Sequence, residues 1–243
     1  MSAIVQPMSV ATPGNRTVVI FPHAGGSPRY YASWTGELPQ GIDLYGVVYP
    51  GRDQLLDAPL PQTVAELAAA CAVELVPIIR SSNCAVLFGH SMGSYVAFEV
   101  ARSLEKADMP IAVLVASGAD APHWQAAAVW HRASDDDLAG HVGALDARSR
   151  DALAIPELRT MFLPTIRDDY RLVETYRAEP APPLSCPIRV IYGDSDPEVS
   201  APGMRAWAEC TRAHSTMRSF PGGHFYLAAH LSEVVSDVCQ VFD

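Results

Sequence analysis

Short apolar runs rich in β-branched residues recur along the chain, separated by stretches long enough to hold a helix. The runs that we predict to be strands are Thr17–Phe21, Leu44–Tyr49, Cys84–Phe88, Ile111–Ser117, Ile188–Tyr192 and Thr216–Phe220. Several are apolar throughout, which is typical of strands buried on both faces of a sheet. Between them, apolar positions recur at helical spacing over Thr63–Ile79, Ser94–Leu104 and Pro202–Cys210. This alternation predicts an α/β fold with a mostly parallel central sheet flanked by helices.

One long interval, about Pro122–Pro183, breaks the alternation because it contains helical patterns and no good strand candidate. Ser134 precedes three aspartates and predicts a capped helix that runs towards Leu145. Pro156 opens a second helical pattern, and the proline-rich segment Ala178–Pro187 predicts the return to the sheet. We therefore expect one domain over residues 1–243 with a helical insertion at about 122–183. The insertion either forms a lid over the site or adds packing helices without a gating role.

Composition narrows the class of protein. The chain has 243 residues, 49% of them hydrophobic, and 17 Lys and Arg against 27 Asp and Glu give a net charge of -10. This charge argues against a nucleic-acid partner. The amino-terminal segment does not resemble a signal peptide, and no run of about 18 apolar residues predicts a membrane helix. The five cysteines form no CxxC pair, so we expect free thiols in a cytoplasmic monomer without a metal site.

The sequence Gly89-His90-Ser91-Met92-Gly93 lies between a predicted strand and a predicted helix. This is the setting of the G-x-S-x-G nucleophile elbow, in which the serine occupies a strained turn and flanking glycines avoid backbone clashes. The turn places the serine hydroxyl at a helix amino terminus, where backbone N–H groups favour developing negative charge. We therefore predict that Ser91 is the nucleophile of a hydrolase. We expect His90 to pack or hydrogen-bond locally.

A serine nucleophile needs a base and a carboxylate that orients the base. His224 follows the last predicted strand and two glycines, and we predict that it is the base, with His230 as the alternative. Asp196 lies in the turn after the strand Ile188–Tyr192, and we predict that it is the acid. Asp194 is the alternative acid, although its position favours capping the turn. The order Ser, Asp, His along the chain matches the α/β-hydrolase fold.

The loop after the first predicted strand reads Phe21-Pro22-His23-Ala24-Gly25-Gly26 and can expose backbone N–H groups. We predict that the N–H groups of Ala24 and of Met92, the residue after the nucleophile, form the oxyanion hole. His23 could act in catalysis, but a structural hydrogen bond that holds this loop is the simpler expectation.

These motifs together resemble the type II thioesterases, the editing enzymes of polyketide and nonribosomal peptide synthesis. The resemblance runs from about Thr17 to Phe242. It rests on 21-FPHAGGS-27, 49-YPGR-52, 89-GHSMG-93 with 97-AFE-99, Ser117-Gly118 with Ala121-Pro122, 193-GDSDP-197 and 222-GGHF-225. The elbow is common to hydrolases of this fold, whereas the oxyanion loop and the Pro-Gly-Arg turn are more selective.

The resemblance implies hydrolysis of acyl thioesters on the phosphopantetheine arm of acyl or peptidyl carrier protein domains, which clears stalled or misprimed chains. It implies the triad Ser91, Asp196 and His224, oxyanion donors at Ala24 and Met92, and no cofactor beyond the phosphopantetheine that the substrate carries. It also places the family's lid on the predicted insertion. The triad itself does not separate thioesters from oxygen esters, so a general carboxylesterase or lipase is the alternative function. A silent relative that only binds acyl groups or synthase partners is a third.

Basic side chains at two places in the sequence could contact a carrier protein. Arg102 and Lys106 are one helical turn apart and could belong to a basic docking patch or to a solvated helix face. Arg52 could meet the phosphate of the arm or fix its own turn.

Overall fold

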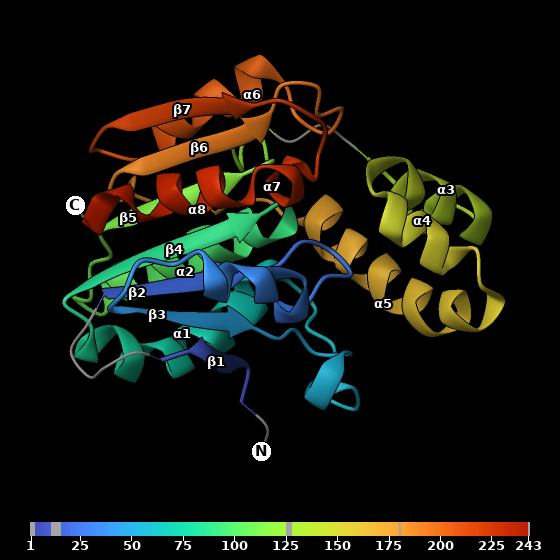
Figure 1. Ribbon diagram of the computed structural model, residues 1–243, viewed down its shortest axis with the longest axis horizontal. Helices are drawn as coiled ribbons and strands as arrows, with labels where there is room; N and C mark the ends of the chain where they lie inside the picture. Colours follow the sequence, from blue (N-terminus) through green and yellow to red (C-terminus); the bar gives the residue numbers. More distant parts are fainter. Residues whose placement is uncertain (1–2, 11–15, 125–127, 180, 243) are drawn as a thin grey trace.

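The computed structural model describes residues 3–10, 16–124, 128–179 and 181–242. Its centre is a seven-stranded sheet in the order β1-β3-β2-β4-β5-β6-β7, parallel except for β1 (Figure 1). The strands are β1 Val5–Ser9, β2 Arg16–Phe21, β3 Ile42–Val47, β4 Cys84–His90, β5 Val113–Ser117, β6 Ile188–Gly193 and β7 Ser215–Phe220. All six predicted strands are confirmed, with small shifts at their ends.

The apolar runs form strands because both faces of the sheet are covered. In β2, Val18 and Ile20 pack on one face with α8 (Leu231–Cys239), while Val19 and Phe21 pack on the other with α1 (Val64–Ser81) and α2 (Met92–Lys106). Alternate side chains of a strand point to opposite faces, so a strand buried on both faces must be apolar at every position. The mostly parallel α/β fold expected from the sequence is confirmed.

The predicted helices also form, with local differences. Thr63 caps α1 by accepting a hydrogen bond from the Glu66 N–H, as expected for a helix that begins there. The stretch Pro202–Cys210 divides into a short helix α6 (Ala201–Arg205) and a 3-10 turn (Ala206–Cys210) instead of one helix. Among the described residues, no helix is long and apolar enough to cross a membrane.

The insertion consists of α3 (Asp135–Leu145), α4 (Ala147–Leu153) and α5 (Pro156–Thr175), and its described part contains no strand. Ser134 caps α3 through the Asp137 N–H, as predicted. The insertion has a small core of its own: Leu138, Leu153, Leu163 and Ile166. Figure 1 shows these helices beyond the end of the sheet towards which the parallel strands point. Residues 125–127 of the insertion and Pro180 of the return segment lie outside the described residues, and the single domain over 1–243 stays a prediction.

Several elements were not predicted. Strand β1 contains Pro7, a residue that argues against a strand, and it shows no clear alternation of apolar and polar residues. Its pairing with β3 is irregular between Pro7 and Ser9. Helix α4 is only seven residues long, and the 3-10 segment Pro28–Gly36 follows a loop rich in glycine and proline. The short helix α7 (Tyr226–Ala229) and α8, both after the last strand, were also missed. These elements are short or lie at edges, where tertiary contacts outweigh local pattern.

The parallel register brings the carboxyl ends of the strands to one edge of the sheet. Phe21 lies opposite Gly89, His90 opposite Ser117, and Gly193 opposite Phe220. The loops that follow β2, β4, β5, β6 and β7 therefore start side by side, which is where open α/β sheets collect functional groups.

The contact between the first residues of α2 and β2 leaves no room for a side chain at Gly93. A Cβ there would lie 1.9 Å from the Phe21 carbonyl oxygen. We expect Gly93→Ala to lower the free energy of unfolding by about 3 kcal/mol, because backbone atoms must move. Gly140→Ala in α3, where a Cβ meets nothing within 4 Å, should raise it by about 0.5–1 kcal/mol. Urea unfolding of both variants measures the difference, and equal stability of the two would contradict this account.

Candidate active site

Ser91 occupies the sharp turn between β4 and α2. Its φ of 53° and ψ of -121° lie in a region that residues with a side chain rarely adopt. The turn is held by the Ser91 N–H, which donates to the Ser117 carbonyl at 2.8 Å, and by Gly89, where a Cβ would lie 2.2 Å from the Gly93 carbonyl oxygen. The structure thus shows the nucleophile-elbow geometry that the sequence predicted, with Ser91 at the amino terminus of α2.

His224 and Asp196 form a buried pair beside this turn. Their Nδ1 and Oδ2 atoms are 2.8 Å apart, and both side chains are almost fully buried. The second carboxylate oxygen of Asp196 accepts the Glu198 N–H at 2.9 Å. An ionised carboxylate only accepts, so Nδ1 of His224 donates and Nε2 carries the free lone pair of the neutral ring. His224 and Ser91 line the same cavity of about 270 Å³.

The alternative residues lie in other roles. Asp194 accepts hydrogen bonds from the Ser195 hydroxyl and from the Gly222 N–H, both at 3.0 Å, so it joins its turn to the loop before His224. His230 pairs with Glu233 on α8 at 3.3 Å, away from Ser91. The structure brings Asp196 and His224 together and leaves Asp194 and His230 outside the pair.

The loop that follows β2 lies against the elbow. Ala24 lines the cavity, the Gly25 N–H donates to Asp169 at 2.7 Å, and the Gly26 N–H donates to the His23 carbonyl at 2.9 Å. Met92 is the first residue of α2, so its N–H belongs to those that a helix leaves unpaired. The two proposed oxyanion donors therefore come from the loop and from the helix beside Ser91.

Two further histidines lie behind the site and are held neutral. His23 Nδ1 is 3.2 Å from the Tyr31 hydroxyl, and burial together with nearby His224 lowers the pKa of His23 to about 3. His90 Nδ1 is 2.9 Å from the Ser117 hydroxyl, and burial followed by His224 lowers the pKa of His90 well below its ordinary value. The His90 ring lies 4.9 Å from the ring of His224. Both therefore have the structural hydrogen bonds expected from the sequence.

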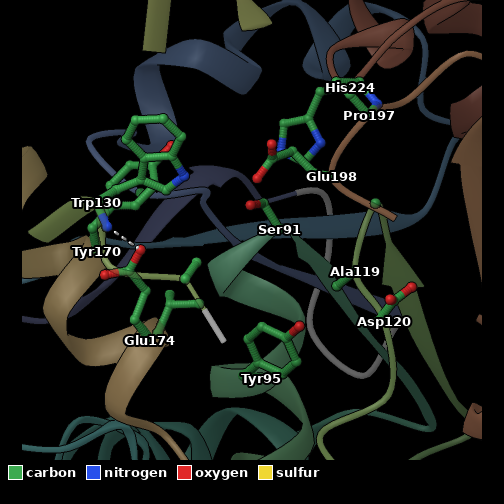
Figure 2. Close-up of a pocket in the computed structure, with 14 residues that line it drawn as sticks. Ser91, Tyr95, Ala119, Asp120, Trp130, Tyr170, Glu174, Pro197, Glu198 and His224 are labelled. Atoms are coloured by element: carbon green, nitrogen blue, oxygen red, sulfur yellow. Dashed lines mark hydrogen bonds between the residues drawn. The ribbon is translucent and has the colours of Figure 1, made fainter. Parts of the chain in front are cut away.

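The insertion supplies the opposite wall of the cavity. Figure 2 shows Ser91 with His224 and Glu198 on one side and Trp130, Tyr170 and Glu174 on the other. Glu174 of α5 is not free, because it accepts the Trp130 and His131 N–H groups at 2.7 and 3.0 Å. The insertion thus covers the site as a lid would. The sequence did not predict these wall residues, because their helical spacing resembles that of any amphipathic helix. Only Glu198 could have been predicted to lie near the site, since it follows Asp196 by two residues.

The two arginines considered for a carrier partner are both engaged internally. Arg52 is buried and pairs with Asp169 at 2.7 Å, so it fixes its surroundings instead of facing a phosphate. Arg102 is also buried and bonds to Glu99 at 2.6 Å and to the Glu179 carbonyl at 2.9 Å. It therefore belongs neither to a solvated face nor to an exposed basic patch with Lys106.

The strand order, the elbow and the His–Asp pair define an α/β-hydrolase of the serine hydrolase class. The chain belongs to the thioesterase family, because the family model described as the thioesterase domain matches residues 16–241. A probable cadicidin biosynthesis thioesterase from Streptomyces griseus is 33% identical over 223 residues, 92% of this chain and 61% of that protein. Thioesterase PikA5 from Streptomyces venezuelae is 33% identical over 91% of this chain and 79% of its own length.

A solved structure defines the subgroup. The type II thioesterase BorB from the borrelidin biosynthetic cluster is 35% identical, covers 100% of both chains and superposes with a TM-score of 0.89. This chain is therefore a type II thioesterase, and the family resemblance expected from its motifs is confirmed.

Buried neutral histidines make stability depend on pH. The unfolded chain binds a proton at His23 below about pH 6.5, whereas the folded protein does not until about pH 3, so this stabilisation is complete above pH 6.5 and is lost as the pH falls. We expect His23 to account for about 2 kcal/mol of the unfolding free energy lost between pH 7 and pH 5. Urea unfolding at both pH values should show that loss shrinking by this amount in His23→Gln. The exposed His214→Gln control should keep the wild-type difference; an unchanged difference in His23→Gln would refute the assignment.

Proposed function

We propose that this chain hydrolyses acyl thioesters held on the phosphopantetheine arm of carrier protein domains, in the editing of polyketide or nonribosomal peptide synthesis. The single observation that carries the proposal is the buried His224–Asp196 pair, which shares a cavity with Ser91 on its strained turn. The family supports the thioester as substrate, since the triad acts equally well in principle on oxygen esters. The name of a similar solved structure, YbtT, a type II thioesterase from the yersiniabactin NRPS/PKS biosynthetic pathway, supports the carrier domain as partner.

In the first half-reaction, the Ser91 hydroxyl attacks the thioester carbonyl carbon and its proton passes to Nε2 of His224. Asp196 holds the ring in the orientation that exposes Nε2 and stabilises the imidazolium that forms. The carbonyl oxygen becomes an oxyanion, which accepts hydrogen bonds from the N–H groups of Ala24 and Met92. The intermediate collapses as the carbon–sulfur bond breaks, and the thiol of the arm leaves with the proton from His224.

In the second half-reaction, His224 takes a proton from water, and the resulting hydroxide equivalent attacks the Ser91 ester. Collapse of the second tetrahedral intermediate returns the proton to the Ser91 oxygen and releases the free carboxylic acid. The cavity walls from the insertion surround the acyl group during both steps. The chemistry needs no cofactor of the protein's own.

The same proposal includes a cytoplasmic monomer. The five cysteines are free thiols, as expected in a reducing compartment. The carrier domains are the only partners in this proposal, which includes neither nucleic acid nor a membrane.

We expect Ser91→Ala to abolish deacylation and Asp196→Asn to reduce kcat by about 10³-fold or more, since the amide stabilises the wrong tautomer of His224. The matched control, Asp194→Asn, replaces a carboxylate that accepts the Gly222 N–H with an amide whose oxygen can accept the same bond, and it should cost no more than about tenfold. Intact mass spectrometry of acetyl-, propionyl- and longer acyl-carrier proteins follows the reaction. A fully active Asp196→Asn would move the acid role to another residue.

The alternatives are separated by running the matching acyl-CoA and p-nitrophenyl esters beside the carrier substrates. Carrier deacylation that exceeds ester turnover and vanishes in Ser91→Ala supports the proposal. Rapid ester hydrolysis with intact acyl-carrier would replace it with a general carboxylesterase or lipase. Failure of a fluorophosphonate to label Ser91 would indicate a silent binding protein.

A further inference from the structure

A buried ion pair joins the insertion to the main domain at the oxyanion loop, residues 22–26. Asp169 lies on α5 and Arg52 in the turn after β3, and their Oδ1 and Nη2 atoms are 2.7 Å apart. Only 4% and 10% of the respective side-chain surfaces are exposed. Burying two charges costs free energy, and hydrogen bonds to the remaining polar atoms offset part of that cost. The partners in those hydrogen bonds therefore show which segment the ion pair holds in place.

Those partners are the backbone of the oxyanion loop. The second oxygen of Asp169 accepts the Gly25 N–H at 2.7 Å, and the second terminal nitrogen of Arg52 donates to the Gly26 carbonyl at 3.0 Å. Each charged group therefore uses one terminal atom for the other and one for the loop, while the Arg52 Nε has no hydrogen-bond partner among the described residues. Gly25 has a φ of 74°, so the loop turns sharply at the point that the pair holds.

Apolar and neutral contacts fix the same loop from both sides. Ile166, one turn before Asp169, packs so closely on Gly25 that a Cβ there would lie 2.7 Å from its Cγ1 atom. The Tyr49 hydroxyl donates to the Pro22 carbonyl at 3.0 Å, and its ring lies under the Arg52 guanidinium at 5.2 Å. The loop is thus anchored at Pro22, Gly25 and Gly26, on either side of Ala24.

The anchoring also selects which N–H groups can face a substrate. The Gly25 N–H is taken by Asp169 and the Gly26 N–H by the His23 carbonyl. Ala24 lies between the anchored residues and lines the cavity with Ser91. The Ala24 N–H lies in the His23–Ala24 peptide plane, and Asp169 fixes the next plane, Ala24–Gly25, through the Gly25 N–H.

We propose that Asp169 and Arg52 are positioning residues that align the Ala24 N–H for the oxyanion, so that lid helix α5 takes part in building the oxyanion hole. This inference rests on the proposed function, in which Ala24 is a donor. Neither side chain touches the substrate; both act through the loop. Their removal should therefore weaken stabilisation of the tetrahedral intermediate while leaving the binding of the carrier substrate in place.

A matched control lies beside Asp169 on the same helix. Asp168 pairs with Arg171 at 2.9 Å, and Arg171 donates to the Pro61 and Gln62 carbonyls, both at 2.9 Å. Both residues of this pair lie on α5, and Arg171 joins the helix to the main domain at the segment before α1 and not at the oxyanion loop. Asp168→Asn therefore tests loss of a neighbouring ion pair without loss of the proposed alignment.

The experiment compares Asp169→Asn, Arg52→Gln and Asp168→Asn with the wild type on an acyl-carrier substrate, with thermal unfolding to verify folding. We expect Asp169→Asn and Arg52→Gln to lower kcat by about 10- to 100-fold, since a misplaced donor forfeits much of its effect, while KM changes less than about threefold. Affinity for an acyl trifluoromethyl ketone, which forms a tetrahedral adduct with the serine, should fall by the same factor as kcat/KM. Asp168→Asn should match the wild type in all three.

Wild-type kcat in a folded Asp169→Asn protein would overturn the inference, as would an equal loss in Asp168→Asn or a loss of kcat with unchanged affinity for the ketone. If Asp169→Asn does not fold, Arg52→Lys decides: it keeps a charge for Asp169 but cannot reach the Gly26 carbonyl as well, and it should show the same pattern with a smaller loss. A wild-type protein that deacylates no thioester would instead refute the proposed function. The two failures are therefore distinguishable.

Discussion

The site depends on close backbone contacts at one edge of the sheet, each made through a glycine. At Gly93 the elbow approaches the end of β2 so closely that a Cβ would overlap the Phe21 carbonyl, and at Gly193 a Cβ would lie 2.2 Å from the Gly223 carbonyl. The first contact holds the nucleophile turn against the oxyanion loop. The second holds the loop of the acid against the loop of the base. Any side chain at these positions would separate the groups that must act together.

The electrostatics of the site follow from this compactness. Of the three histidines gathered beside Ser91, only His224 has a carboxylate partner, and His23 and His90 have hydroxyl partners instead. Burial keeps those two neutral, so the positive charge that the proposed mechanism places on His224 meets no charged histidine beside it. In the proposed mechanism, Asp196, which is buried and bonded at both oxygens, stabilises this charge.

The insertion has two relations to the rest of the molecule. Its wall residues, among them Trp130 and Glu174, shape the cavity, and its small separate core keeps α3, α4 and α5 together. Helix α5 is in addition tied to the main domain by the Asp169–Arg52 ion pair and by Arg171, which donates to the Pro61 and Gln62 carbonyls. Because of these ties, a large displacement of the carboxyl-terminal half of α5 would break a buried ion pair and two hydrogen bonds.

The sequence by itself determined the elements and motifs whose requirements are local. Apolar runs specified six of the seven strands, and the glycines around Ser91 and His224 specified turns that only glycine permits, so Ser91, Asp196 and His224 could be chosen from short stretches of chain. What only the tertiary structure decided depends on residues far apart in sequence. From the sequence, Arg52 could either bind the phosphate of the arm or fix its own turn. The structure pairs it with Asp169, 117 positions away. Tertiary packing likewise decides the edge strand β1, the cavity wall and the partners of Arg102. Buried charges and edge strands depend on neighbours that are distant in sequence, and no local pattern predicts those neighbours.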